Sequence, residues 1–155
     1  MTIANQANYT TETTLRVRYQ ETDQMGVVYY ANYLVWFEVG RSDFIRNQGY
    51  SYQLFEERGL LLPVVEVQCK YLAPARYDEE IVVLTRLAEF SGGKMVFEYR
   101  IMRAEDRKLL VTGMSKHLWV NKEMKRVNIK HLYPEVFDKL AALCPKEKDG
   151  SRCSG

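Results

Sequence analysis

The sequence contains few of the signals that mark secreted, membrane-spanning or metal-binding proteins. No stretch approaches the ~20 consecutive apolar residues of a transmembrane helix, and residues 1–14 lack the basic start and apolar run of a signal peptide. Its three cysteines are odd in number and show no CxxC pattern or Cys/His spacing suited to zinc. We therefore expect a protein of the reducing cytoplasm that does not insert into membranes.

The sequence also lacks a strong excess of charge and the common catalytic motifs. Its 22 Lys and Arg residues against 20 Asp and Glu residues give a formal net charge of +2, too small to indicate a nucleic-acid partner. It contains no GxSxG elbow, GxxxxGKS/T phosphate loop, GxGxxG turn or HExxH motif. The two histidines, His117 and His131, have no evident Ser or Cys partner, and we expect His117 to be a structural side chain. Carboxylates are the remaining candidates for catalysis.

Alternation of apolar and polar residues predicts the strands. It occurs in five runs, at residues 14–19, 62–72, 80–90, 95–103 and 109–120. The links between the last four runs are short and rich in turn-forming residues, so these strands should pair antiparallel. With 155 residues, 46% of them hydrophobic, the chain can bury a core as one domain. We predict an α+β domain at 13–143 with an antiparallel five-stranded sheet, flanked by flexible segments at 1–12 and 144–155.

The longest helix is predicted to follow the first strand. A helical spacing of three and four, mostly of apolar residues, runs from residue 30 to 48, and Gly49 is a suitable stop. The opposite side also carries Val35, Trp36 and Val39, and a helix that is apolar on most of its circumference suits burial by a curved sheet or at a subunit interface. Because one sheet edge would stay exposed in a monomer, we expect a homo-oligomer. Shorter helices are predicted at 51–58 and 134–143.

The loop before this helix holds the strongest candidate for catalysis. Asp23 and Gly26 lie in the turn-forming run ETDQMG, just before an aromatic helix start. Apolar surroundings can prepare a carboxylate to act as a base or nucleophile. The first turn of a helix presents unpaired N–H groups that can serve as an oxyanion hole. These groups together suit acyl transfer from a thioester. The alternative is that Asp23 only caps a turn or the helix.

The residues around Asp23 resemble a known family. TDQMGVVYYANYLVWFEVGR is similar to the signature of the 4-hydroxybenzoyl-CoA thioesterase family of hotdog-fold acyl-CoA hydrolases: Asp, two variable residues, Gly, Val, Val, two more residues, then Asn-Tyr and Phe-Glu in a helix. The run KYLAPARYD at 70–78 is also typical of these enzymes, and the resemblance covers residues 15–120. It implies a hotdog fold, in which the five-stranded antiparallel sheet wraps around a long central helix.

The resemblance implies roles for individual residues. Asp23 matches the family's catalytic aspartate, which acts as nucleophile on the thioester carbonyl or as general base for water. Tyr30 matches the helix-start residue whose backbone N–H polarises that carbonyl, and Gly26 matches the glycine that lets the loop approach the substrate. Members of the family are tetramers built from dimers, with active sites between subunits and CoA draped over the surface. The resemblance therefore implies a homotetramer, or at least a dimer, that binds acyl-CoA.

The sequence departs from the family at the turn that binds CoA phosphates. In the enzyme that gives the family its name this turn is rich in Arg and Lys, whereas here Ser91 and Gly92 precede a single cation, Lys94. Lys94 is the best candidate for a phosphate contact, although exposed lysines are usually only solvated. Some relatives carry His at the position of Tyr30, so any role of a histidine side chain at this position is lost in this sequence.

Four further residues are candidates for contacts with the substrate. Tyr33 belongs to an aromatic group that would suit a benzoyl-like or naphthoyl-like acid, although the same residues would pack any helix. Glu38 is either a pocket carboxylate or an ion-pair partner of Arg41 at i,i+3. Val64 and Val65 either shape the acyl pocket or belong to ordinary strand core.

The resemblance and the loop chemistry together predict an acyl-CoA thioesterase for aromatic or short- to medium-chain acyl groups, without metal or organic cofactor. An acyl-carrier-protein thioesterase and a catalytically silent acyl-binding hotdog module are the alternatives. A hotdog hydratase or dehydratase is disfavoured, because it needs a His–Asp or His–Glu pair on the helix and neither histidine lies there.

Overall fold

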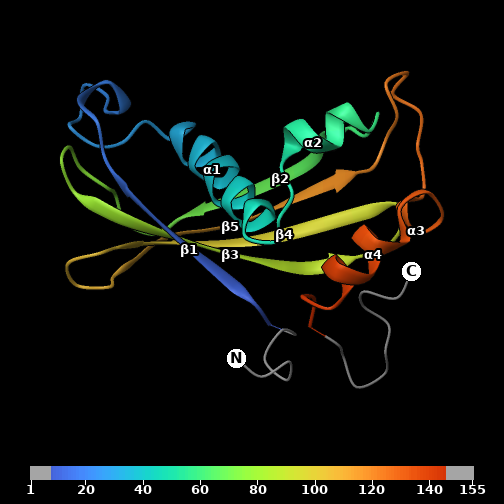
Figure 1. Cartoon of the computed structure of the whole chain (residues 1–155). Coiled ribbons are helices and arrows are strands. Elements are labelled where there is room, and N and C mark those ends of the chain that lie inside the picture. Colours follow the sequence, from blue (N-terminus) through green and yellow to red (C-terminus); the bar gives the residue numbers. More distant parts are fainter. Residues whose placement is uncertain (1–7, 146–155) are drawn as a thin grey trace.

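The computed structural model describes residues 8–145, which form one curved sheet with a long helix on one face (Figure 1). The strand order is β1-β3-β4-β5-β2, and every pairing is antiparallel. The strands are β1 (Thr10–Arg16), β2 (Val64–Tyr71), β3 (Glu80–Phe90), β4 (Lys94–Arg103) and β5 (Leu109–Leu118). The helices are α1 (Asn32–Arg46), α2 (Tyr52–Glu57), α3 (Ile129–Leu132) and α4 (Pro134–Ala141), and a 3-10 turn, η2, covers Tyr19–Glu21. The predicted α+β fold is confirmed.

The first strand lies earlier in the chain than predicted. β1 covers Thr10–Arg16, whereas the alternation predicted a strand at 14–19. The run looks polar, yet Thr13 is buried and its hydroxyl donates to Asp43 Oδ2 of α1 at 2.8 Å. Threonine is β-branched and fits a half-buried strand once its hydroxyl has a partner. The predicted flexible segment 1–12 was therefore wrong for the residues that pair in β1.

The two ends of the chain are only partly described. Residues 1–7 and 146–155, which make up most of the predicted flexible segments, lie outside the described range. Cys144, which belongs to the predicted flexible segment 144–155, is fully buried in the hydrophobic core instead. The core thus extends past the predicted domain boundary at residue 143.

Helix α1 lies close to the sheet because small residues face large ones across the interface. A Cβ atom on Gly40 of α1 would collide with the Thr85 and Val83 side chains of β3. The Phe37 ring stacks on Tyr99 of β4, with centroids 4.2 Å apart and planes 7° from parallel. Gly113 of β5 leaves the space that this ring occupies. The helix is therefore fixed in place over the centre of the sheet.

The β2 side of the molecule is uncovered. β2 is the last strand in the sheet order, so one of its edges has no partner strand within residues 8–145. Val64, Val65 and Val67 on β2 are 43–51% exposed, and Val35 on α1 is 50% exposed. Trp36, from the same predicted apolar side of the helix, is buried. An apolar strand edge of this kind is normally covered by another chain or element.

The other predicted strands and helices agree with the structure to within a few residues, and among residues 8–145 the sequence did not predict α3 or the 3-10 turn η2. Across the described part of the chain, no helix combines the length and the apolar character that crossing a bilayer requires.

Candidate functional site

The chain between β1 and α1 folds into a small hairpin that carries Asp23. The Asp23 N–H donates to the Val27 carbonyl at 2.9 Å, and the Gly26 N–H donates to the Asp23 carbonyl at 3.0 Å. Gly26 has a φ of +77°, a region that favours glycine. No atom lies within 4 Å of the place where a Cβ on Gly26 would stand. Backbone conformation, not crowding within the chain, therefore explains the glycine.

The Asp23 carboxylate caps this turn and keeps one oxygen uncommitted. Oδ1 accepts the Met25 N–H at 2.8 Å, which is the turn-capping role considered from the sequence. Oδ2 has no hydrogen-bond or ion-pair partner among residues 8–145. The side chain is half-buried. The hairpin adjoins the start of α1, because Thr22 pairs with Val28 and the Tyr29 N–H donates to the Glu21 carbonyl.

The start of α1 presents two backbone N–H groups without protein acceptors. The Tyr29 N–H donates to the Glu21 carbonyl at 2.9 Å, and the Asn32 N–H donates to the Tyr29 carbonyl at 2.9 Å. The Tyr30 and Ala31 N–H groups, by contrast, have no acceptor in the described part of the chain, and no side chain caps the helix. They lie at the positive end of the helix dipole, so they suit an oxygen that gains negative charge.

Tyrosine side chains surround this helix start. The Tyr71 hydroxyl donates to the Tyr30 carbonyl at 2.9 Å, and the Tyr33 ring lies 5.4 Å from Tyr71 and 5.0 Å from Trp36. Tyr33 is 3% exposed, and its hydroxyl accepts the Ala75 N–H at 3.1 Å. The Tyr33 side chain is thus buried behind the Asp23 hairpin. Tyr30 is 61% exposed, so a ligand can reach its side chain.

The predicted CoA-binding turn lies at the opposite end of the sheet. Ser91, Gly92 and Lys94 form the turn after β3, whereas the Asp23 hairpin follows β1 near the start of β3 (Figure 1). β3 has 11 residues, which at ~3.3 Å per residue span roughly 35 Å. A single chain therefore does not bring Lys94 and Asp23 together.

Val64 and Val65 lie at the same end of the sheet as this turn. Val64 and Met95 both pair with His117 of β5, so the start of β2 is close to the β3–β4 turn. The register of β2 shifts between Val64 and Glu66, and both valines are exposed, by 47% and 51%. The interpretation of Val64 and Val65 as ordinary strand core is therefore wrong for the single chain.

The β3–β4 turn carries a second cation that the sequence analysis missed. The Ile129 N–H donates to the Gly92 carbonyl at 2.8 Å, and a Cβ on Gly92 would collide with the Asn128 side chain. This contact brings Arg126 to the turn, where its Nη2 lies 3.6 Å from the position of a Cβ on Gly93. No short-range pattern links Arg126 to the turn, since the two meet only in the folded chain.

Glu38 is exposed on α1, and the ion pair with Arg41 considered from the sequence does not form. No carboxylate of the described residues lies within 4 Å of the Arg41 guanidinium. Burial disfavours the charge of Arg41, but the Tyr99 and Tyr52 hydroxyls and the more distant Glu38 carboxylate hold the pKa of Arg41 above its ordinary value. Arg41 therefore faces the core, and Glu38 stays in reach of solvent.

A buried hydrogen-bond chain shows that our expectation of a His117 without a serine partner was wrong. Ser115 Oγ lies 2.7 Å from His117 Nε2 and 2.6 Å from the Tyr99 hydroxyl, and all three side chains are buried. His117 Nδ1 lies 3.2 Å from the Leu62 carbonyl, so Nδ1 carries the proton and Nε2 accepts from Ser115. Burial and the charge of Arg41 lower the pKa of His117 to about 4. Residues two apart in a strand share a face, a signal that could have revealed the pair.

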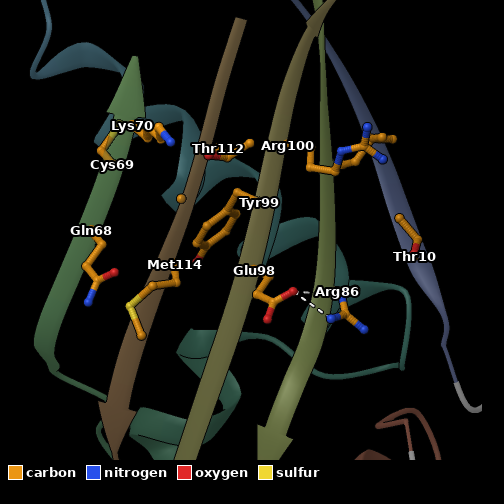
Figure 2. A pocket seen from close by; sticks show the side chains of 12 residues that line it. Thr10, Gln68, Cys69, Lys70, Arg86, Glu98, Tyr99, Arg100, Thr112 and Met114 are labelled. Atoms are coloured by element: carbon orange, nitrogen blue, oxygen red, sulfur yellow. Dashed lines mark hydrogen bonds and ion pairs between the residues drawn. The ribbon is translucent and has the colours of Figure 1, made fainter. Parts of the chain in front are cut away.

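A groove of about 740 Å³ lies on the face of the sheet opposite α1 (Figure 2). Its polar side chains, among them Lys70 and Arg100, come from alternate positions of neighbouring strands. Arg86 donates to Glu98 Oε2 there, from Nε at 3.0 Å and from Nη2 at 2.6 Å. The lining includes none of the residues predicted for the site. Within residues 8–145, no group of three or more His, Cys, Asp or Glu side chains could hold a metal ion.

Comparison with known proteins identifies relatives along most of the chain. The family described as the thioesterase-like superfamily matches residues 17–142. The protein named "Putative acyl-CoA thioesterase YneP" of Bacillus subtilis is 41% identical over 122 residues, which are 78% of this chain and 88% of YneP. The acyl-CoA thioester hydrolase YbgC of Escherichia coli O157:H7 is 34% identical over 92 residues, 59% of this chain and 69% of YbgC.

A solved structure agrees with these matches. The crystal structure of DHNA-CoA thioesterase from Staphylococcus aureus superposes with a TM-score of 0.81 and 31% identity, over 84% of this chain and 87% of that one. The sheet and its long helix are thus the hotdog fold, as the resemblance implied. The matches do not show that the chain belongs to the 4-hydroxybenzoyl-CoA thioesterase family in particular. At the level that the comparisons show, the chain belongs to the thioesterase-like superfamily.

Proposed function

We propose that this chain is a thioester hydrolase acting on acyl-CoA, with Asp23 as nucleophile or general base and the Tyr30 N–H as oxyanion donor. The supporting observation is the geometry of the hairpin. Asp23 keeps one carboxylate oxygen uncommitted in a hairpin that adjoins the start of α1, where the Tyr30 N–H is unpaired. The names of the relatives, "Putative acyl-CoA thioesterase YneP" and "Acyl-CoA thioester hydrolase YbgC", support the same substrate class.

The proposed reaction needs only these groups and water. The thioester carbonyl oxygen accepts the Tyr30 N–H, which stabilises the negative charge that develops on it. Asp23 Oδ2 either attacks the carbonyl carbon, giving an anhydride that water hydrolyses, or takes a proton from an attacking water. In both cases the C–S bond breaks, the thiolate leaves and is protonated, and the free acid is released. The Met25 N–H on Oδ1 orients the carboxylate for either role.

A second copy of the chain would complete the site. If two β2 edges pair antiparallel about a two-fold axis, the start of one β2 lies beside the end of the other. Tyr71 ends β2 and bonds to Tyr30, so the pairing would bring Val64, Val65 and the β3–β4 turn of one chain to the Asp23 hairpin of the other. The same pairing would cover the exposed apolar edge. We therefore propose a dimer, alone or as half of a tetramer, with sites between subunits.

We propose an aromatic or short- to medium-chain acyl group as the substrate. The exposed rings of Tyr29, Tyr30 and Tyr71 lie together beside the helix start, and such rings offer an apolar surface with polar edges. Lys94 and Arg126 of a second chain would provide two cations for the phosphates of CoA. An acyl-carrier-protein thioester presents the same reacting carbonyl and remains the alternative substrate. We expect the reaction to take place in the cytoplasm.

A thiol-release assay over a panel of acyl-CoAs tests the proposal. Asp23→Asn keeps the oxygen that caps the turn but loses the basic carboxylate, so we expect kcat to fall at least ~10²-fold with an unchanged circular dichroism spectrum. The matched control is Asp138→Asn on the exposed face of α4, which should keep wild-type turnover. Equal turnover in Asp23→Asn and the wild type would remove Asp23 from the mechanism.

Two further measurements distinguish the alternatives. Binding of an acyl-CoA without release of thiol by the wild type would favour the silent acyl-binding module. Light scattering would test the site between subunits, because a monomer that hydrolyses thioesters at full rate would contradict it.

A further inference from the structure

Glu21 is a buried carboxylate that the proposed reaction does not use. It lies two residues before Asp23 and is 6% exposed. Its Oε1 accepts the Arg18 N–H at 2.8 Å, and its Oε2 accepts the Trp36 Nε1–H at 2.9 Å. The Arg18 Nε lies 3.4 Å from Oε1, but this side chain is 65% exposed. One carboxylate oxygen is therefore held by the chain before the hairpin, and the other by helix α1.

The backbone of Glu21 joins the same two parts of the molecule. Its carbonyl accepts the Tyr29 N–H at 2.9 Å and the Asn32 Nδ2–H at 2.8 Å. Tyr29 directly precedes the unpaired N–H groups, and Asn32 is the first residue of α1. Glu21 thus connects the residue that enters the Asp23 hairpin to the helix start that follows it, through both its side chain and its main chain.

The charge state of Glu21 strengthens these contacts. Burial raises the pKa of Glu21, but the N–H groups of Arg18 and Trp36 and the Arg18 charge outweigh this effect and hold the pKa below its ordinary value. The carboxylate is therefore ionised at neutral pH. Hydrogen bonds to an ionised acceptor are shorter and stronger than neutral ones, so the Trp36–Glu21 contact is well suited to fix a loop.

We propose that Glu21 is a positioning residue that holds the Asp23 hairpin against the first turn of α1. The inference rests on the proposed function, because the quantity that Glu21 would set is the distance between the Asp23 carboxylate and the Tyr30 N–H. The hairpin itself is short, and its internal hydrogen bonds do not orient it relative to the helix. A misplacement of ~1 Å in such a pair costs on the order of 10²-fold in rate.

Two substitutions separate this role from a general loss of packing. Glu21→Gln keeps the side-chain shape, but its NH₂ group cannot accept, so either the Arg18 N–H or the Trp36 Nε1–H loses its acceptor. Trp36→Phe keeps an aromatic ring and removes the indole donor. The matched control is Trp119→Phe, because Trp119 is fully buried and its Nε1 has no hydrogen-bond partner among the described residues.

We expect Glu21→Gln to lower kcat about 10²-fold and Trp36→Phe to lower it about tenfold, each with KM within about threefold of the wild type. Trp119→Phe should keep the wild-type kcat. The double variant should lose less than the product of the two single losses, because both changes act on the contact between Trp36 and the Glu21 carboxylate. A wild-type kcat in Glu21→Gln, multiplicative losses in the double variant, or an equal loss in Trp119→Phe would each overturn the proposal.

A second readout, by NMR, does not depend on turnover. The chain has two tryptophans, so its spectrum contains two indole N–H signals, which the two Trp→Phe variants assign. Glu21→Gln should shift the Trp36 signal, leave the Trp119 signal in place and speed hydrogen exchange at the Tyr29 amide. If this occurs in a protein that hydrolyses no thioester of the panel, the contact is confirmed and the proposed function fails. If thioesters are hydrolysed but neither kcat nor Tyr29 exchange responds, the positioning role fails.

Discussion

Two buried polar clusters of this molecule hold their ionisable groups in opposite charge states. Burial acts on Glu21 to raise its pKa, yet the N–H donors of Arg18 and Trp36 prevail and keep the carboxylate charged. Burial and the Arg41 charge act on His117 in the same direction and keep the imidazole neutral, with a pKa of about 4. Burial alone therefore does not decide the charge of a group, since the donors and charges that face it do.

The two clusters also differ in what they join. Glu21 links a hairpin to a helix start, where backbone N–H groups are still unpaired. His117 links β5 to the chain before β2, and its hydrogen bonds are satisfied inside the core by Ser115 and the Leu62 carbonyl. The first cluster leaves groups free for a ligand, and the second leaves none, which is why the candidate site lies at the first.

Glu21→Ala should produce the largest loss of stability. It leaves the buried Trp36 Nε1–H and the Arg18 N–H without acceptors, and each such group costs ~1–3 kcal/mol. We expect the free energy of unfolding to fall by about 3 kcal/mol in urea at pH 7. A loss below about 1 kcal/mol would mean that water replaces the carboxylate, and the contrast with the core cluster would not hold.

Ser115→Ala should have the next largest effect. It removes the acceptor of the Tyr99 hydroxyl and the donor to His117 Nε2, both in the core. We expect a loss of about 2.5 kcal/mol in the same unfolding experiment. Ser42→Ala is the matched control, because Ser42 is half-exposed on α1, and it should change stability by no more than about 0.5 kcal/mol.

The two clusters should also respond to acid in different pH ranges. The folded pKa of His117 is about 4 against 6.5 in the unfolded chain, so the unfolded state binds more protons between these values and stability falls as the pH falls from 6.5 towards 4. Between pH 7.5 and 5 we expect a loss of about 2 kcal/mol, measured by urea unfolding. His117→Gln should abolish this loss.

Glu21 should respond at lower pH. Its folded pKa lies below the ordinary value of 4.5, so its contribution is complete above 4.5 and disappears as the pH falls through the folded pKa. Glu21→Gln should flatten the stability profile below pH 4.5 and leave the range above it unchanged. A flattened profile between pH 6.5 and 5 in this variant would reverse the assignment of the two groups.

An exposed ion pair should show the smallest effect on stability, and it serves as the reference for the two buried clusters. Arg86 and Glu98 form two hydrogen bonds on the open face of the sheet, where both side chains are more than 30% exposed. A double-mutant cycle with Arg86→Gln and Glu98→Gln should give a coupling of about 0.5 kcal/mol that weakens with added salt. If this coupling energy is as large as the one between Glu21 and Trp36, burial is not the reason why the Glu21–Trp36 contact is strong.

Local patterns in the sequence were enough to predict most of the fold. Alternation placed the last four strands, and the spacing of apolar residues placed α1, because each signal depends only on neighbours along the chain. β1 was misplaced because a threonine run looks polar until Thr13 meets Asp43 across the helix interface. The position of Asp23 before a helix start was likewise predictable from turn-forming residues and periodicity alone.

The candidate site was predictable only in part. Asp23 and Tyr30 are seven positions apart in the sequence, and the Tyr29–Glu21 hydrogen bond joins the Asp23 hairpin to the start of α1, whereas the catalytic roles of both residues stay a prediction. Lys94 was assigned to the same site, but the length of β3 separates it from Asp23 within one chain. In the proposed dimer, Lys94 would reach the site only from a second chain, and no pattern along the sequence predicts which sheet edges pair between chains.

The sequence by itself determined most of the alternating strands, the turn around Asp23 with its glycine, and the aromatic helix start, because these follow from turn chemistry and periodicity over a few residues. The hotdog topology was implied by the resemblance to a known family. Tertiary structure alone decided that Trp36 reaches Glu21, that Tyr99 joins the Ser115–His117 pair, and that Arg126 reaches the β3–β4 turn beside Gly93. The physical reason is that the charge state and hydrogen bonds of a buried group depend on every side chain that faces it. Most of those side chains come from distant parts of the sequence.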